Sequence, residues 1–146
     1  MTRAVPAGDE PVGLLLRLAG ILYDGLLVLA LVFLGTLPLV VMNAGEAIPA
    51  HTPWYRLWLL AIVAGYFVFF WVRGAETLGM KSWRIMIVSR DGGPVTVRRA
   101  MLRAAASVLS WLPCGAGFLW SLVDSDGLAW HDRLSGTKLV RSAKRR

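Results

Sequence analysis

The feature that most constrains the fold is an apolar run of about 30 residues, from Val12 to Met42. As a helix this run would be roughly 45 Å long, whereas the hydrocarbon core of a bilayer is about 30 Å thick. We therefore predict that residues 12–23 lie at the membrane interface and that residues 24–41 span the bilayer. The core of the run begins only near Gly25 and is longer than that of a signal peptide. We expect an uncleaved helix, preceded by a short exposed lead over residues 1–11.

A second apolar run, from Leu57 to Val72, contains no charged residue. Asparagine, glycine and proline residues interrupt the segment before it, over residues 42–53, which predicts a loop. Aromatic residues stand at both ends of the run, the pattern of the aromatic belts at the two surfaces of a membrane. Charged residues make up only 17% of the chain, against about a quarter in soluble domains. We predict that residues 57–72 form a second span.

The basic residues are distributed unevenly, and their distribution predicts the orientation of the chain. Residues 73–99 contain six basic and two acidic residues, whereas residues 42–56 contain one of each. Because basic residues collect on the cytoplasmic side of a membrane, the N-terminus is predicted to be cytoplasmic and the first loop external. Residues 124–146, which end in a basic tail at 141–146, contain six basic and three acidic residues. This segment is also predicted to be cytoplasmic.

A third apolar block, residues 100–123, leaves two alternatives open. Its length fits a straight third span, which would place the basic tail outside. Alternatively, the chain turns back at Pro113, Gly115 and Gly117. Residues 98–112 would then form one arm and residues 118–133 the other, each about 15 residues or roughly 23 Å long. Such arms would turn back as a re-entrant or surface-lying hairpin, which needs cover by protein at that depth. The charge of the tail favours this second alternative, which we prefer.

Three short segments predict strands rather than helices. Residues 83–88 are partly alternating and rich in β-branched side chains. A turn sequence at residues 91–94 follows, so residues 95–97 are predicted to pair back as a β-hairpin on the cytoplasmic surface. Residues 137–140 are a candidate for one more strand. The predicted fold is all-α integral membrane, a single domain over residues 1–146, with two long transmembrane helices, the third apolar segment and this small β-hairpin.

Two charged residues interrupt the first apolar run. Arg17 and Asp24 are seven residues apart, about two helical turns, so they project from one face at roughly 10 Å from each other. That separation is too long for a direct salt bridge, so each would need a partner on another helix. Ionisable groups at membrane depth are costly and are candidates for function. The alternative for Arg17 is that its long side chain extends to the interface.

The second candidate cluster is residues 130–133, which include His131 and Asp132. Neighbouring residues of a helix do not face each other, so these two are not a catalytic dyad by adjacency. The alternative is an interfacial helix with an aromatic anchor and solvated charges. The sequence offers no nucleophile–base pair and no metal-ligand set, so we expect neither an enzyme nor a cofactor. It also has no basic stripe interleaved with aromatic residues, which a nucleic-acid groove would need.

Together these motifs resemble the RDD family of bacterial membrane proteins, which is named for one arginine and two aspartates. The matching stretches are residues 17–24 in the first apolar run and residues 130–137 near the C-terminus. The family's Thr-x-Gly segment is similar to residues 77–81. The resemblance covers residues 12–140. It implies that the defining residues are Arg17, Asp24 and Asp132, and the secondary candidates in the matching stretches are His131, Thr77 and Gly79.

The sequence supports two hypotheses about function. Some members of the family have been proposed as cation/proton antiporters, which implies a role in ion or small-solute transport. Asp24 and Asp132 would then bind the cation or proton, and Arg17 would act on both through its charge. Alternatively, the three residues form a structural network in a non-catalytic membrane scaffold or accessory subunit. Either hypothesis predicts a multi-pass protein of the bacterial inner membrane that works as a homo-oligomer or with a membrane-protein partner.

Overall fold

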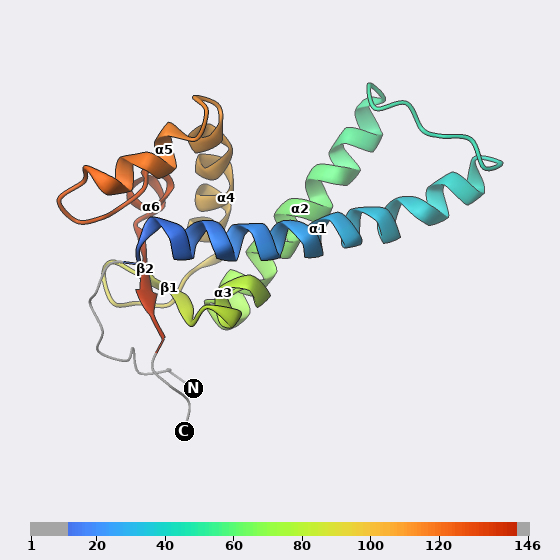
Figure 1. Ribbon diagram of the computed structural model, residues 1–146. Coiled ribbons are helices and arrows are strands. Elements are labelled where there is room, and N and C mark those ends of the chain that lie inside the picture. The colour runs from blue at the N-terminus through green and yellow to red at the C-terminus, as the bar shows by residue number, and fades with distance from the viewer. Residues whose placement is uncertain (1–11, 143–146) are drawn as a thin grey trace.

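The computed structural model describes residues 12–142, so the predicted lead (1–11) and most of the predicted basic tail (143–146) lie outside the described residues. The chain is mostly helical. Two long helices, α1 (Leu14–Met42) and α2 (Pro53–Gly74), form an arm that projects from a group of shorter elements (Figure 1). Both are long and apolar enough to cross a membrane. The predicted pair of long apolar helices is therefore confirmed.

Helix α1 has 29 residues, or about 44 Å, and continues through Asp24 without a break. Its buried residues, Arg17, Gly20 and Asp24, all lie in the half that faces the shorter elements. Its most apolar 18-residue stretch has no buried residue. The first part of α1 is therefore a packing surface, and the rest extends away from the protein core with its leucine and phenylalanine side chains exposed.

The two helices of the arm approach closely near the loop that joins them. A Cβ atom on Gly35 would lie 2.7 Å from Cδ1 of Ile62, so the absence of a side chain at Gly35 lets Ile62 pack against α1. The indole Nε1 of Trp58 donates a hydrogen bond of 3.2 Å to the carbonyl oxygen of Gly35. Helix α2 begins at Pro53, a residue that suits the first turn because no N–H is needed there. These contacts hold the arm together at the end far from the shorter elements.

After α2 come a short helix, α3 (Leu78–Ser82), and strand β1 (Ile85–Ser89). Strand β1 pairs antiparallel with β2 (Thr137–Arg141) in a two-stranded sheet. The segment predicted as a strand near the C-terminus is thus the partner, and the predicted hairpin with residues 95–97 is wrong. The reason is local, because Thr96 caps the start of the next helix by accepting a hydrogen bond from the backbone N–H of Arg99.

The third apolar block is broken, as the preferred alternative predicted, and it is not a straight helix. Helix α4 (Val97–Trp111) ends before Gly115, which has a φ of 80° that favours glycine. The chain then bends by 108° into α5 (Ala116–Leu119) and a 3-10 helix, η1 (Trp120–Leu122). The predicted second arm is not one helix, because a loop separates η1 from α6 (Trp130–Ser135).

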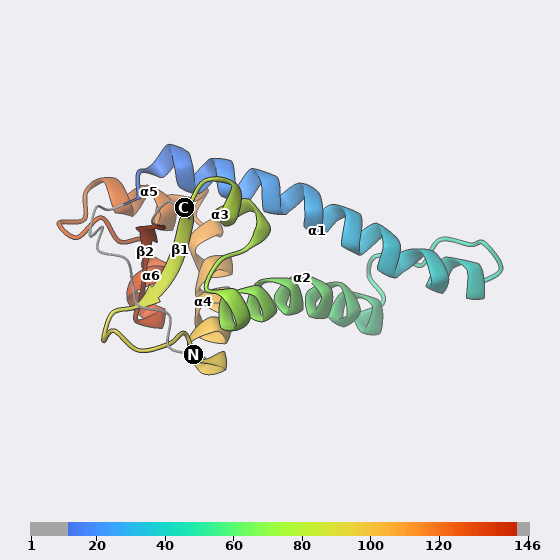
Figure 2. The same cartoon turned by 90° about the horizontal axis from the view of Figure 1, so that it is seen from below.

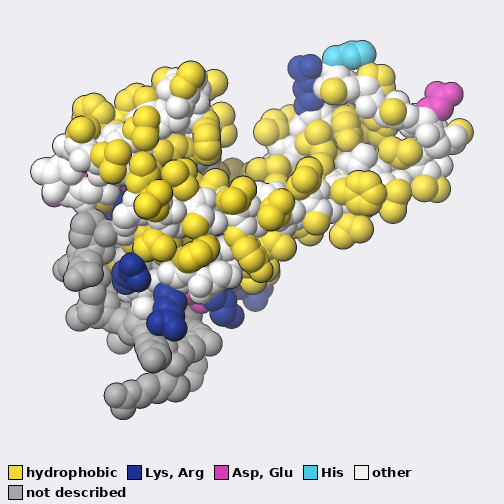
Figure 3. All heavy atoms as spheres, viewed as in Figure 1, with side chains coloured by type: hydrophobic (Ala, Val, Ile, Leu, Met, Phe, Trp, Pro, Cys, Tyr) yellow, Lys and Arg dark blue, Asp and Glu magenta, His cyan; other side chains and the backbone are white. Residues whose placement is uncertain are grey.

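The sheet and α4 form the base onto which the arm packs. In Figure 2, α1 and α2 run side by side, with α4 at the end opposite their connecting loop. A core of buried apolar residues lies where β1 meets α2 and α4, and includes Trp71, Ile85, Ile87 and Ala100. Figure 3 shows hydrophobic side chains over the arm and over α4 and α5, while Lys and Arg side chains gather below α1 near the sheet. This distribution fits a membrane protein.

Candidate functional site

Asp132 lies in the protein interior between two arginines. Its Oδ2 atom is 2.6 Å from Nη1 of Arg17 in α1, and its Oδ1 atom is 2.5 Å from Nη1 of Arg103 in α4. The exposed fraction is 4% for Arg17, 3% for Arg103 and 0% for Asp132. Because Asp132 belongs to α6, this buried triad joins three helices that are far apart in the sequence.

The other hydrogen bonds of the triad fix the segments around it. Most of the donors and acceptors are thereby paired inside the protein, as buried charged groups require. Two guanidinium groups face one carboxylate, so the triad has a net charge of +1. The bonds run from Arg17 Nε to the carbonyl oxygen of Val12 (2.9 Å), from Arg17 Nη2 to that of Gly127 (2.8 Å), from Arg103 Nη1 to Thr137 Oγ1 (2.7 Å), and from the Ala129 N–H to Asp132 Oδ2 (3.0 Å).

The charges of Arg103 and Arg17 lower the pKa of both Asp132 and His131 in α6. Burial alone would raise the pKa of Asp132, but Arg103 and Arg17 hold the pKa of that carboxyl well below its usual range. Burial lowers the pKa of His131 to about 3, and the charge of Arg103 acts in the same direction. At neutral pH His131 is therefore uncharged, and its 3.7 Å approach to Asp132 is not an ion pair.

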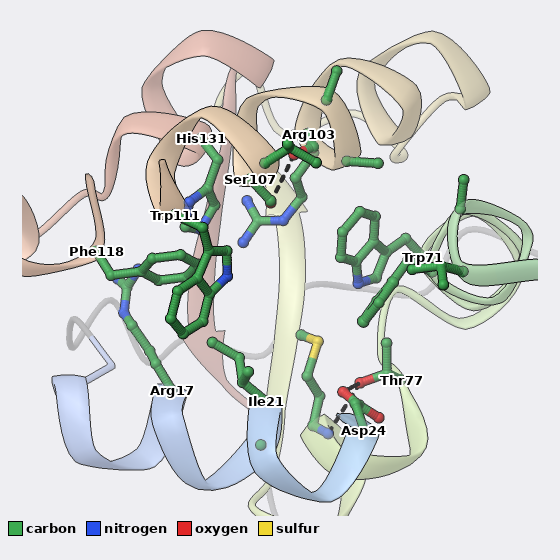
Figure 4. Close-up of a pocket in the computed structure, with 18 of the residues that line it drawn as sticks. Arg17, Ile21, Asp24, Trp71, Thr77, Arg103, Ser107, Trp111, Phe118 and His131 are labelled. Atoms are coloured by element: carbon green, nitrogen blue, oxygen red, sulfur yellow. Dashed lines mark hydrogen bonds between the residues drawn. The ribbon is translucent and has the colours of Figure 1, made fainter. Parts of the chain in front are cut away.

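Asp24 forms a second buried network, 3% exposed, between α1, α2 and α3. Its Oδ1 accepts a hydrogen bond from the hydroxyl of Tyr66 (2.8 Å) and another from the backbone N–H of Gly79 (2.8 Å). Its Oδ2 accepts from the hydroxyl of Thr77 (2.5 Å), toward which Asp24 points in Figure 4. Thr77 in turn accepts from the N–H of Met80 and caps α3. The carboxylate therefore fastens α3 and α2 to α1.

The Asp24 network depends on a close approach of two glycines. A Cβ atom on Gly79 would lie 2.4 Å from the carbonyl oxygen of Gly20 and 2.8 Å from the carboxylate of Asp24. A Cβ atom on Gly20 would meet its nearest neighbour at 3.9 Å, an ordinary contact. The Thr-x-Gly segment is thus explained by geometry, because threonine supplies a hydroxyl donor and glycine lets the backbone N–H reach the carboxylate.

The structure places the residues predicted from the sequence in two networks rather than one. Arg17 and Asp24 share a face of α1, and each has its partners on other elements, as expected. The side chain of Arg17 is 4% exposed and pairs with Asp132 inside the protein, so it does not extend to the protein surface. Asp24 and Asp132 share no hydrogen-bond partner among the described residues. Of the secondary candidates, Thr77 and Gly79 bind Asp24, while His131 lies beside the triad.

Sequence reasoning missed two members of these networks, Arg103 and Tyr66. Arg103 lies about one turn beyond Arg98 and Arg99, the basic residues at the start of α4. A signal was present, because Ala100, Ala106 and Ser110 place small residues on the same helical face as Arg103, and all three are buried. Tyr66 gave no comparable signal, since it lies among other aromatic residues of α2.

A cavity of about 450 Å³ lies between α1, α2 and α4, next to both networks (Figure 4). Most of its lining is apolar, from residues such as Val63, Phe67 and Val108. This combination of an apolar wall and a few polar groups is typical of ligand sites. The polar residues that line it are Arg17, Asp24, Thr77, Arg103, Ser107 and His131.

The arrangement offers little for covalent or metal chemistry. The described residues contain no group of three His, Cys, Asp or Glu side chains that could hold a metal ion. The hydroxyl of Ser110 lies 3.3 Å from Nδ1 of His131, but Ser110 is fully buried and also bonds to the carbonyl oxygen of Ala106. Gly117 packs directly against Ser110 and leaves no room for a substrate there.

Comparison with known proteins gives one match. The sequence model described as the RDD family matches residues 11–136, which include Arg17, Asp24, Arg103 and Asp132. No curated protein and no solved structure matched the chain. The resemblance drawn from the sequence motifs is therefore confirmed at the level of the family.

Proposed function

Since the chain belongs to the RDD family, we propose that it is a non-catalytic membrane scaffold or accessory subunit whose buried charges hold a lipid-facing arm onto the rest of the protein. The observation that carries this proposal is Asp132, whose two carboxylate oxygens are each bound by an arginine from another helix. A carboxylate that binds a cation must present free oxygen to it. Asp132 instead has its charge directed at two fixed partners inside the protein.

The surroundings of Asp24 support the same proposal. Its neighbours Tyr66, Thr77 and Gly79 all present O–H or N–H donors to the carboxylate. A cation site of this kind would instead need carbonyl, carboxylate or water oxygens facing the ion. Asp24 is thus surrounded by donors, in the manner of a structural cap. On this view the two networks fasten α1 at two points, one to α2 and α3 and the other to α4 and α6.

The test is the folded amount and the thermal stability of Asp24→Asn and Asp132→Asn in detergent. Both should fall, because each substitution removes the charge for which the surrounding donors are arranged. Asp126→Asn is the matched control, since this aspartate is half-exposed and lies 3.5 Å from the exposed Arg133. Normal yield and an unchanged melting temperature in both buried variants would contradict the proposal.

The second candidate is cation/proton exchange, and one observation favours it. Asp24 and His131 line the same cavity, so a titratable group of one network and one beside the other adjoin a single space. Two spans are few for a transporter, so a pathway would need several copies of the chain. The test is cation-dependent proton flux in proteoliposomes. Proton flux that disappears in Asp24→Asn, with folding intact, would favour cation/proton exchange. No flux in the wild-type protein would contradict exchange and leave the scaffold role as the supported proposal.

We also propose that the chain is a multi-pass protein of a bacterial inner membrane, with a cytoplasmic N-terminus. The positive charge of residues 73–99 supports this orientation. The exposed apolar side chains of α4, such as Leu102, Leu109 and Trp111, support contact with lipid or with another membrane subunit. We propose a homo-oligomer or a membrane-protein partner and no role in nucleic-acid binding. Crosslinking in native membranes, followed by mass spectrometry, tests this proposal.

A further inference from the structure

Two buried donors at the cavity have no acceptor among the described residues. They are Nε of Arg103 and Nε1 of Trp71, in residues that are 3% and 7% exposed. Both residues line the cavity of about 450 Å³. Their side chains lie together in Figure 4, and the guanidinium carbon of Arg103 is 5.3 Å from the centre of the Trp71 ring. An unpaired buried donor is costly, so this pair calls for an acceptor.

The charge at this point of the cavity is positive. Asp132 offsets only one of the two guanidinium groups that it binds, and the neighbouring His131 is uncharged at neutral pH. The other carboxylate of the lining, Asp24, is occupied by its own three donors at the α3 side. The two unpaired N–H groups belong to residues that line the cavity, in a region of net charge +1, which favours an anionic acceptor beside them.

The rest of the cavity is suited to a hydrocarbon chain. Its wall is apolar, and three of its residues are also largely exposed at the surface between α2 and α4, which marks this side as the opening. They are Leu60 at 60%, Met101 at 52% and Val108 at 61% exposed. On a helix pair that faces lipid, such an opening admits a molecule from the membrane rather than from water.

We propose that the cavity binds a single-chain amphiphile with a carboxylate headgroup, such as a long-chain fatty acid. The carboxylate accepts hydrogen bonds from Arg103 Nε and Trp71 Nε1, one for each oxygen. The chain lies along the apolar wall and leaves between α2 and α4. This site is independent of the proposed scaffold role, because both carboxylates of the buried networks keep their protein partners when the cavity is filled.

The experiment measures binding of radiolabelled hexadecanoate to the full chain, delipidated in an uncharged detergent. Hexadecanol, which has the same chain without the charge, is the matched ligand, and a diacyl phosphatidylglycerol is the competitor. We expect the carboxylate to bind at least about tenfold more tightly than the alcohol, the effect of a hydrogen bond to a charged group. We also expect the phospholipid not to displace it.

Three variants locate the site. Trp71→Phe keeps an aromatic ring beside Arg103 but removes its N–H, and should weaken binding about tenfold, since one bond to a charged acceptor is lost. Trp83→Phe is the matched control, because Trp83 is 44% exposed and does not line the cavity, and its binding should be unchanged. Ala104→Phe fills the cavity and should abolish binding. The melting temperature of the Ala104→Phe variant without ligand shows whether this variant folds.

Several results would overturn the proposal. Equal affinity for hexadecanoate and hexadecanol would show that the two donors do not bind the headgroup. Unchanged binding in Trp71→Phe would place the headgroup elsewhere, and this result holds even when Ala104→Phe fails to fold. Displacement by the phospholipid would show that the site takes a lipid phosphate instead. None of these results depends on whether Asp24→Asn and Asp132→Asn fold, so they leave the scaffold proposal unaffected.

Discussion

Arg17 and Asp132 are 115 residues apart in the sequence and form a buried ion pair of 2.6 Å between α1 and α6. Taking two such charges out of water costs several kcal/mol per ion, and only close geometry with further hydrogen bonds offsets that cost. Here Arg103 supplies the second guanidinium, and backbone carbonyl groups complete the pairing of Arg17. The triad therefore specifies how α1, α4 and α6 meet, because any other arrangement leaves a buried charge without a partner.

Removal of Arg17 should be strongly destabilising. In Arg17→Met, Asp132 keeps one guanidinium, and two carbonyl groups lose their donor, so we expect a loss of about 3–5 kcal/mol, as for other broken buried pairs. Thermal unfolding in detergent, followed by size-exclusion chromatography, measures the effect. Arg133→Met is the control, because the Arg133 side chain is 44% exposed and pairs with Asp124 and Asp126 outside the triad. Equal melting temperatures in the two variants would contradict this account.

Gly79→Ala and Gly20→Ala should differ sharply, although the two glycines face each other. The new Cβ in Gly79→Ala overlaps the carbonyl oxygen of Gly20 and pushes α3 away from Asp24. We expect a loss of about 1–3 kcal/mol, typical of overpacking. Gly20→Ala adds a Cβ with its nearest contact at 3.9 Å and should be close to wild type. The melting temperatures of both variants test this difference. An equal decrease in the two variants would contradict the close approach of Gly79 to the backbone of Gly20.

The buried state of His131 should make stability fall with acid. Its pKa is about 3 in the folded protein and about 6.5 in the unfolded chain, so the unfolded chain binds the proton more readily. The contribution of His131 to the free energy of unfolding is fully present above pH 6.5 and is lost progressively as the pH falls toward 3. Between pH 7.5 and 5 the loss should approach about 2 kcal/mol, since each pH unit below 6.5 contributes about 1.4 kcal/mol.

The measurement for His131 is the melting temperature in detergent across that pH range. His131→Gln should flatten the dependence, because glutamine does not titrate. His51→Gln should leave it unchanged, since His51 is exposed in the loop between α1 and α2. The window stays above the ordinary pKa of aspartate, so Asp132 contributes little to the slope. A slope that persists in His131→Gln would assign the effect to another group.

Both ends of the chain should lie on the same side of the membrane. Arg17 is one turn from the start of α1, and it contacts Asp132, which lies five residues before β2 begins. A bilayer cannot separate residues in direct contact, so the basic C-terminal segment stays with the N-terminus. Reporter fusions at each end test this, with a third reporter in the loop at residues 43–52 as the opposite control. Ends on opposite sides would contradict the triad.

Several elements of the fold follow from local sequence. The two predicted spans, 24–41 and 57–72, lie inside α1 and α2, because length and apolar composition suffice to identify such helices. The break at Gly115 follows from the conformational demands of proline and glycine. Strand pairing did not follow, since the nearby residues 95–97 were predicted to pair with β1. That choice depends on Thr96 as a helix cap and on a partner strand from the far end of the chain.

The sequence by itself determined the family, the two long apolar helices and the identity of three charged residues that need partners. It did so because apolar length, breaker residues and short motifs are local properties of the chain. Only the tertiary structure decided that Arg103 completes the triad and that Asp24 belongs to a separate network with Tyr66 and Thr77. Those pairings depend on the packing of helices distant in the sequence, and a charge alone does not specify which partner packing brings to it.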